Sequence, residues 1–369
     1  MYSKLYINKL VVLMKSIISG IQQMGIGVPN VEAIWEWYRT YFGIDIKVFE
    51  EAAPAPLMLN YTGGVVQNRT ATLALSMEGG GGFEIWQFTS RTTEKAKFDI
   101  QLGDFGIYAC KIKSRDIKTT YAFFKKNNLN LLSELEEKPD GSKYFFIQDP
   151  NENLFEIIES QSVFTTTDFE GKTGGVAGAI IGVSDIYCSL NFYQNLLGYD
   201  TIVYDETNEF KAYRNLNGGS KIVRRVLLKH SQERRGPFSE LLGESQIELI
   251  QAIDSTNCQK IFENRFWGDW GFIHLCFDVQ GMNALKQECE KAGYPFTVDT
   301  GETFDMGEAA GRFSYVEDPD GTLIEFVETH KVPVLKKLGW YIHLKNRNPE
   351  KKLPKWMLKC MKFNRHKTK

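Results

Sequence analysis

Six polar side chains interrupt short apolar segments of this 369-residue chain in a repeated pattern. One is His274, in GFIHLCFDV at 271–279, and another is Gln23, in the similarly spaced GIQQMGIGV at 20–28. The other four are glutamates between apolar neighbours, namely Glu84 in FEIW, Glu156 in FEII, Glu248 in IELI and Glu325 in IEFV. Imidazole and carboxylate groups can bind metal ions or transfer protons. An unpaired carboxylate in a dry core is costly, so four of them at matching places require a common cause.

Bulk composition sets outer limits on function. The hydrophobic content of 43% and charged content of 24% are ordinary for a globular protein, and the length is sufficient for two domains. A net charge of −2 argues against a nucleic-acid partner. The charge is uneven, because residues 331–369 hold eleven Lys and two Arg against one acidic residue. The basic stretch at 221–238 is predicted to grip an acidic substrate or to form a solvated face.

The cysteines show no CxxC spacing and no tight framework. They are Cys110, Cys188, Cys258, Cys276, Cys289 and Cys360. In a chain of this length the pattern predicts reduced thiols in a cytoplasmic protein. The apolar stretch LVVLMKSII at 10–18 is too short to span a bilayer and is followed by no small-residue cleavage site, so a signal peptide is not expected.

Two internal matches divide the chain into similar halves. WYRTYFGID at 37–45 matches FYQNLLGYD at 192–200, and FFIQDPNENLFEIIE at 145–159 matches SYVEDPDGTLIEFVE at 314–328. We therefore expect an N-terminal extension at 1–19, a first domain at 20–164, a polar Gly-rich linker at 165–175, a second domain at 176–330 and a basic C-terminal tail at 331–369.

Each half divides again, which predicts an α+β fold of four βαβββ modules. Amphipathic helices are expected near 31–42, 115–127, 185–197 and 280–292, each after one strand and before several short β-type runs. The GGGG run at 79–82 is expected to be a flexible hairpin loop, because no phosphate-binding GxxxxGK motif follows it.

The opening strands can be aligned on the last apolar residue before each helix, which gives Val28, Ile112, Val183 and Val279. Five positions earlier stand Gln23, Ile107, Gly178 and His274. The closing strands contribute the four glutamates. Modules one and four therefore have two polar positions each, whereas modules two and three keep only Glu156 and Glu248. We interpret these two glutamates as either vestigial or salt-bridged, rather than catalytic.

These motifs resemble those of the vicinal oxygen chelate superfamily, which includes glyoxalase I, bleomycin-resistance proteins and extradiol dioxygenases. The resemblance spans 20–330 and depends on FYQNLLGY at 192–199, its partner WYRTYFGI at 37–44, the two DP-containing endings and His274. It implies two glyoxalase-like domains whose half-barrel sheets surround one divalent metal ion. The ligand set that it implies is Gln23, Glu84, His274 and Glu325, if modules one and four face each other. A site within the second domain alone would instead use Glu248, His274 and Glu325.

The same resemblance implies a glyoxalase-type lyase or isomerase that acts on a small α-oxygenated carbonyl compound and uses Zn, Mn, Ni, Co or Fe. Glu325 is then the candidate base, with Glu84 as the alternative. Two other functions stay open. One is an extradiol-type dioxygenase, for which a second aligned histidine is lacking, and the other is a non-catalytic protein that binds a small molecule. We expect a monomer, and a solvating or docked basic tail rather than a membrane-surface helix.

Overall fold

The computed structural model describes residues 15–166, 171–253, 257–301, 304–305, 310–335 and 338–366. The start of the expected extension (1–14), four linker residues (167–170) and the end of the tail (367–369) lie outside these ranges. Within them, helices and strands alternate in the order predicted for four βαβββ modules, which confirms the α+β class. No helix in the described ranges is long and apolar enough to cross a membrane.

The modules follow one another along the chain. The first contains β1 (Ile17–Gly27), α1 (Val31–Tyr41), β2 (Ile46–Pro54), the 3-10 helix η1 (Pro56–Tyr61), β3 (Asn68–Leu75) and β4 (Gly82–Phe88). The second contains β5 (Gly106–Ser114), α2 (Ile117–Lys126), β6 (Asn130–Leu131), β7 (Glu136–Glu137), β8 (Lys143–Gln148) and β9 (Leu154–Glu159).

The third module contains β10 (Val176–Gly182), α3 (Ile186–Asn195), β11 (Thr201–Asn208), η2 (Lys211–Tyr213), β12 (Val223–Lys229), α4 (Ser239–Leu242) and β13 (Gln246–Ala252). The fourth contains β14 (Gly271–Gln280), α5 (Met282–Lys291), β15 (Val298–Asp299), β16 (Phe304–Asp305), β17 (Ala310–Glu317) and β18 (Leu323–Leu335). After them come β19 (Trp340–His343), α6 (Lys355–Lys359) and η4 (Cys360–Asn364).

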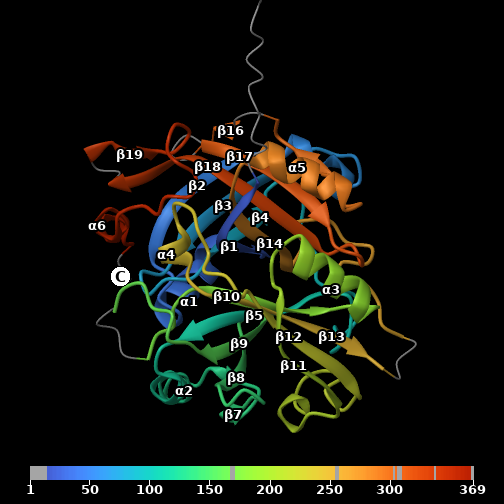
Figure 1. Ribbon diagram of the computed structural model, residues 1–369. Coiled ribbons are helices and arrows are strands. Elements are labelled where there is room, and N and C mark those ends of the chain that lie inside the picture. The colour runs from blue at the N-terminus through green and yellow to red at the C-terminus, as the bar shows by residue number, and fades with distance from the viewer. Residues whose placement is uncertain are drawn as a thin grey trace, which may run out of the picture.

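Each of the two sheets combines modules from both halves of the sequence. The strand order β15-β17-β18-β14-β1-β4-β3-β2 joins modules one and four, and we call this the outer-module sheet. The order β11-β12-β13-β10-β5-β9-β8-β6 joins modules two and three, and we call this the inner-module sheet. Figure 1 shows the blue and orange-red strands of the first together above the teal-to-yellow strands of the second. The modules therefore pair across the two halves.

Strands β1 and β14 lie side by side at the centre of the outer-module sheet. Their antiparallel register sets Gln23 opposite Cys276 and Gly25 opposite His274. On the outer sides, Gly25 pairs with Glu84 of the parallel strand β4, and Cys276 pairs with Glu325 of the parallel strand β18. Gln23 and His274 thus occupy equivalent positions, as the strand alignment predicted.

The repeated motifs of the sequence connect the two sheets. Tyr38 of the WY motif donates a hydrogen bond of 2.6 Å to the carboxylate of Asp149 in the first DP turn. Tyr193 of the FY motif donates one of 2.9 Å to Asp318 in the second DP turn. All four side chains are buried. Because these bonds join module one to two and module three to four, the most recognisable motifs serve packing rather than the polar site.

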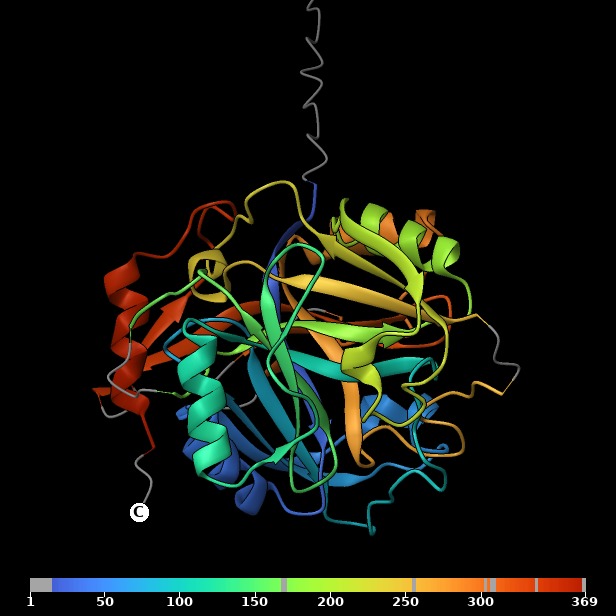
Figure 2. The same ribbon diagram turned by 90° about the horizontal axis from the view of Figure 1, so that it is seen from below.

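The segment after β18 packs against the outer-module sheet. Leu344, Leu353, Leu358 and Met361 are buried in the same apolar cluster as residues of β2, β3 and β4. Arg365 makes an ion pair of 3.0 Å with Asp45 just before β2. In Figure 2 the red helix of this segment lies at the edge of the molecule. The described part of the basic tail is therefore a docked element of the fold.

The glycine run at 79–82 leads from β3 into β4, which pair as an antiparallel hairpin, so the expected hairpin connection is confirmed, but the run is buried. All four residues are buried, and Gly79 and Gly80 have φ angles of +91° and +96°. A Cβ atom on Gly79 would lie 2.7 Å from the carbonyl oxygen of Leu241. Gly81 forms an isolated bridge with Val176, the first residue of β10. The glycines are a local signal for the hairpin connection, but the close approach of two backbones depends on tertiary packing, which local sequence does not display.

Candidate metal centre

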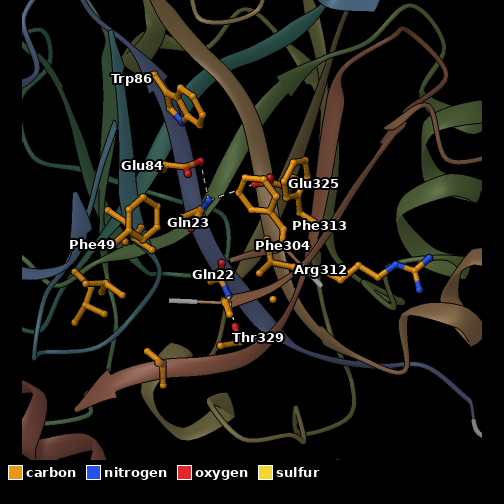
Figure 3. Close-up of a pocket in the computed structure, with 18 of the residues that line it drawn as sticks. Gln22, Gln23, Phe49, Glu84, Trp86, Phe304, Arg312, Phe313, Glu325 and Thr329 are labelled. Carbon is orange, nitrogen blue, oxygen red and sulfur yellow. Dashed lines mark hydrogen bonds between the residues drawn. The ribbon is translucent and has the colours of Figure 1, made fainter. Parts of the chain in front are cut away.

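The structure brings Gln23, Glu84, His274 and Glu325 together on the outer-module sheet. The Nε2 atom of His274 lies 3.3 Å from Oε2 of Glu84 and 3.2 Å from Oε2 of Glu325. The Nε2 atom of Gln23 lies 2.9 Å and 3.2 Å from the same two carboxylate oxygens. Figure 3 shows Gln23 between the two glutamates. One ligand atom each from Glu84, His274 and Glu325 falls within 4.8 Å of the others, which is close enough for a single cation.

Gly25 makes room for the imidazole of His274. A Cβ atom at Gly25 would lie 2.4 Å from both Cε1 and Nε2 of the ring. Real side chains do not tolerate such contacts, so any larger residue at position 25 would displace the ring. In the inner-module sheet the equivalent residue is Ile180, which pairs with Glu248 as Gly25 pairs with Glu84. Sequence analysis did not identify Gly25 as a site residue, although the MGIG segment next to Gln23 contains it.

Tyr315 orients the imidazole from its other side. Its hydroxyl oxygen lies 3.3 Å from Nδ1 of His274, and both side chains are buried. With Nδ1 protonated and donating to Tyr315, the lone pair of Nε2 faces the two carboxylates, which is the tautomer a metal ligand requires. Sequence analysis also missed Tyr315, because no local signal distinguishes it from other tyrosines of the strands.

The charged and polar groups of the centre would be better compensated with a bound cation than without one. Burial raises the pKa of Glu325 to about 7, and the negative charge of Glu84 adds to this effect. Burial lowers the pKa of His274, but the carboxylates of Glu325 and Glu84 outweigh it, so that the net pKa is raised. Among the described residues, Oε1 of Gln23 is buried without a hydrogen-bond partner. A divalent cation would pair with both carboxylates and accept this orphaned oxygen as a ligand.

Metal affinity is expected to fall when the pH is lowered from about 8 to about 6, because protons on Glu325 and His274 compete with the cation. A raised pKa means that each group holds its proton up to a higher pH, so affinity should drop by roughly tenfold per pH unit for each proton displaced. Calorimetric titration with Mn²⁺ across this range, in buffers of different ionisation enthalpy, measures both affinity and protons released. A pH-independent affinity would contradict the assignment.

The inner-module sheet carries a lysine where the outer-module sheet has its candidate metal centre. The Nζ atom of Lys111 pairs with the carboxylate of Glu156 and lies 2.6 Å from Oε2 of Glu248. Glu248 also accepts a bond of 2.7 Å from Nε of Arg225, and Glu156 lies 2.8 Å from Nζ of Lys138. All five side chains are buried. The interpretation of Glu156 and Glu248 as salt-bridged is confirmed, and a site that combines Glu248 with His274 is excluded because they lie in different sheets.

One position of the strand alignment was displaced. Lys111 pairs with Glu156 as Cys276 pairs with Glu325, so the residue of module two equivalent to His274 is Ala109 rather than Ile107. Ser114 is the structural equivalent of Val279, but it is polar. The alignment on the last apolar residue therefore used Ile112, which lies two positions earlier. Ser114 is buried and satisfied by a bond of 2.8 Å to Thr120.

An apolar cavity opens next to the candidate metal centre. Gln23, Glu84 and Glu325 form part of its lining, while Phe49, Trp86 and Phe313 contribute to its walls. Figure 3 shows these side chains around the polar group. A concave apolar site with a few convergent polar groups is the usual form of a small-molecule site.

Three arginines of the basic stretch at 221–238 are engaged by carboxylates of the protein itself. Arg224 makes a bidentate pair with Asp205, at 2.8 Å and 2.7 Å. Arg225 is buried against Glu248, and Arg235 pairs with Glu350 at 3.1 Å. Each of these cations already has a carboxylate of its own. Arg224 and Arg235 make pairs at the surface, as the alternative of a solvated face predicted, whereas Arg225 serves the buried cluster.

Comparison with known proteins identifies the family. The family model described as "Glyoxalase/Bleomycin resistance protein/Dioxygenase superfamily" matches residues 20–157 and 175–326. These ranges make up more than half of the chain, which therefore belongs to this superfamily, and the resemblance noted in the sequence is confirmed. A comparison with curated proteins gave no match.

Two solved structures illustrate the shared fold. Glyoxalase I from Zea mays is 13% identical, with a TM-score of 0.51, and the match covers 85% of this chain and 92% of that protein. A putative dioxygenase from Bacillus subtilis subsp. subtilis str. 168 is 14% identical, with a TM-score of 0.54, over 85% of this chain and 86% of that one. Such low identities establish the glyoxalase-like fold alone.

Proposed function

We propose that the protein is a metal-dependent lyase or isomerase of the glyoxalase type that acts on a small α-oxygenated carbonyl compound. The observation that carries the proposal is the convergence of one imidazole, one amide and two carboxylates on a single buried point beside an apolar cavity. These four side chains would hold one Zn, Mn, Ni, Co or Fe ion. When bound, such a cation would act as a Lewis acid toward a carbonyl oxygen.

The residues around this point have distinct tasks in the proposal. Glu325 is the proposed base for the proton next to the carbonyl, since a pKa of about 7 suits proton transfer near neutrality. Glu84 faces it from the opposite strand and is the alternative base. Tyr315 holds the ring of His274, and the apolar walls exclude water from the reacting groups. The low polarity of these walls strengthens the interactions of the charged groups with substrate.

Loss of the carbonyl-adjacent proton to solvent tests the proposal. The metal-loaded wild-type protein should exchange this proton of an α-hydroxy ketone for deuterium in D₂O, as followed by NMR. Glu325→Gln keeps the shape of the side chain and removes the base, so exchange should slow by roughly 100-fold or more. If Glu84→Gln alone slows exchange, Glu84 takes the role of the base.

Metal binding separates this proposal from its alternatives. Purified protein without bound metal, and without a thermal shift on addition of Mn²⁺, Zn²⁺, Ni²⁺, Co²⁺ or Fe²⁺, would overturn the enzyme proposal and favour a protein that only binds a small molecule. Uptake of oxygen with Fe²⁺ and a catechol would favour a dioxygenase. Gln23 stands where a second histidine would be needed for the two-histidine, one-glutamate ligand set of the extradiol dioxygenases, and this counts against that activity.

A further inference from the structure

The walls of the cavity beside the candidate metal centre are built from apolar side chains that come from distant parts of the chain. Strands β2 to β4 supply Phe49, Leu73 and Trp86, the segment at α4 supplies Leu241, strand β17 supplies Phe313 and the docked C-terminal segment supplies Met361. Trp86 packs edge-on against Trp267, which also lines the cavity, with 4.5 Å between ring centroids. The opening includes Leu57 of η1, which is 41% exposed.

The cationic groups that line this cavity are already engaged by protein partners. Arg69 pairs with Glu51, and its guanidinium lies 4.7 Å from the centroid of the Trp86 ring. Arg312 donates to both carboxylate oxygens of Asp299, at 2.9 Å and 2.8 Å. Among the described lining residues, these arginines are the only cations, and each is already paired with a carboxylate, although Nε of Arg69 is buried without a hydrogen-bond partner.

Part of the neutral polar lining is engaged as well, whereas Oε1 of Gln23 and the indole nitrogens of Trp86 and Trp267 are buried without a hydrogen-bond partner among the described residues. Gln22 donates to Oδ1 of Asp278 at 3.4 Å and to the hydroxyl of Thr329 at 3.2 Å, and the Thr329 hydroxyl in turn donates to Asp278. Asp278 is fully buried behind them. A charged group on a ligand would therefore lose its hydration in this cavity without meeting a cation that lacks a carboxylate partner, which is unfavourable.

We propose that the compound bound here is an uncharged α-oxygenated carbonyl compound with a bulky aromatic or alkyl group, rather than an anionic conjugate or a short polar ketone. The proposal deepens the function proposed above, because the oxygen atoms would face Gln23, Glu84, His274 and Glu325. The apolar group would then lie against Phe49, Trp86 and Phe313. Each buried CH₂ group contributes about 0.8 kcal/mol to such binding, which is roughly fourfold in affinity.

Three probes test the inference in calorimetric titrations of the Mn²⁺-loaded protein. They are phenacyl alcohol, which is uncharged and carries a phenyl ring, hydroxyacetone, which has a methyl group in its place, and the anionic hemithioacetal of glutathione and methylglyoxal. Phenacyl alcohol should bind on the order of 100-fold more tightly than hydroxyacetone, since several apolar carbons are buried. Equal or tighter binding of hydroxyacetone or the hemithioacetal would overturn the inference and leave the proposed function standing.

A matched pair of variants locates the binding site. Leu57 and Leu59 belong to the same 3-10 helix and are 41% and 39% exposed, but only Leu57 lines the cavity. Leu57→Glu should weaken phenacyl alcohol binding by roughly tenfold, because a carboxylate at the opening must be desolvated, and Leu59→Glu should leave it unchanged. Phe313→Ser, at a half-buried wall position, should also weaken it by roughly tenfold. If both cavity variants bind like the wild type, the apolar group lies elsewhere and the inference is wrong.

The metal-free protein separates the two proposals. Phenacyl alcohol should still bind the His274→Ala variant without metal, more weakly than the loaded wild type, because the apolar walls remain. If this binding is observed and the wild type binds no metal, the proposed reaction is wrong, but the proposed apolar specificity stands. Absence of binding both with and without metal would overturn the apolar specificity.

Discussion

Replacing His274 with alanine should lower the affinity of the protein for Mn²⁺ or Zn²⁺ by roughly 100-fold or more. Loss of a side chain that only supports a metal ligand already costs about 10–100-fold, and His274 supplies the one imidazole of the group. The remaining Glu84, Glu325 and Gln23 would offer oxygen ligands alone, which hold transition metals less tightly than a mixed set. Calorimetric titration at a pH of about 8 measures the difference, since Glu325, with a pKa of about 7, is then mostly ionised.

A surface histidine provides the matched control for this variant. His343 is exposed on β19, so His343→Ala should bind metal like the wild type. The alanine at position 274 would lie opposite Gly25, where no larger group needs to be accommodated. We therefore expect the metal-free variant to remain folded, as circular dichroism would show. Equal metal affinity of His274→Ala and the wild type would remove the proposed centre.

The four modules were predictable because their signals are local. The helix at α5 shows its apolar face in Met282 and Leu285, and the WY and FY motifs repeat because Tyr38 and Tyr193 make the same bond to a DP turn. Gln23 and His274 could be paired because both lie at the same distance in the sequence before a helix. Their equivalent positions in the sequence predict that both side chains belong to one polar group.

The partners of that group could not be predicted in the same way. Gly25 matters only because the strand beside it carries His274, and Tyr315 matters only because β17 brings it to the back of the ring. Lys111 looks like an ordinary strand lysine in ACKIKS. Its side chain runs past Gly178 of the neighbouring strand, where a Cβ atom would lie 3.2 Å from Cδ of the lysine and 1.8 Å from the carbonyl oxygen of Gln246. Such relations appear when strands from separate modules pair.

Replacing Lys111 with methionine should destabilise the protein by about 3 kcal/mol or more, which is the effect expected when one partner of a buried ion pair is removed. The ammonium group is fully buried between Glu156 and Glu248. Without it, the Oε2 atoms of Glu156 and Glu248 would be two negative charges in a site without water. Arg225 and Lys138 would still pair with the Oε1 atoms of these glutamates. Urea denaturation at neutral pH, compared by midpoint and slope, measures the loss.

The pH dependence of this loss distinguishes an electrostatic cause from a simple packing defect. Burial alone would raise the pKa of Glu248, but Arg225 and Lys111 outweigh it and hold the pKa well below its usual range. Removing Lys111 should raise the pKa of Glu248, so that its protonation relieves the variant as the pH falls from about 8 to about 5. The stability deficit relative to the wild type should therefore become smaller as the pH is lowered.

Lys229→Met provides the control. This half-exposed lysine lies 3.7 Å from Asp140, and its replacement should change stability by less than about 0.5 kcal/mol at either pH. A Lys111→Met deficit that is small, or that stays constant with pH, would show that the ammonium group does not neutralise the two carboxylates in the inner-module sheet.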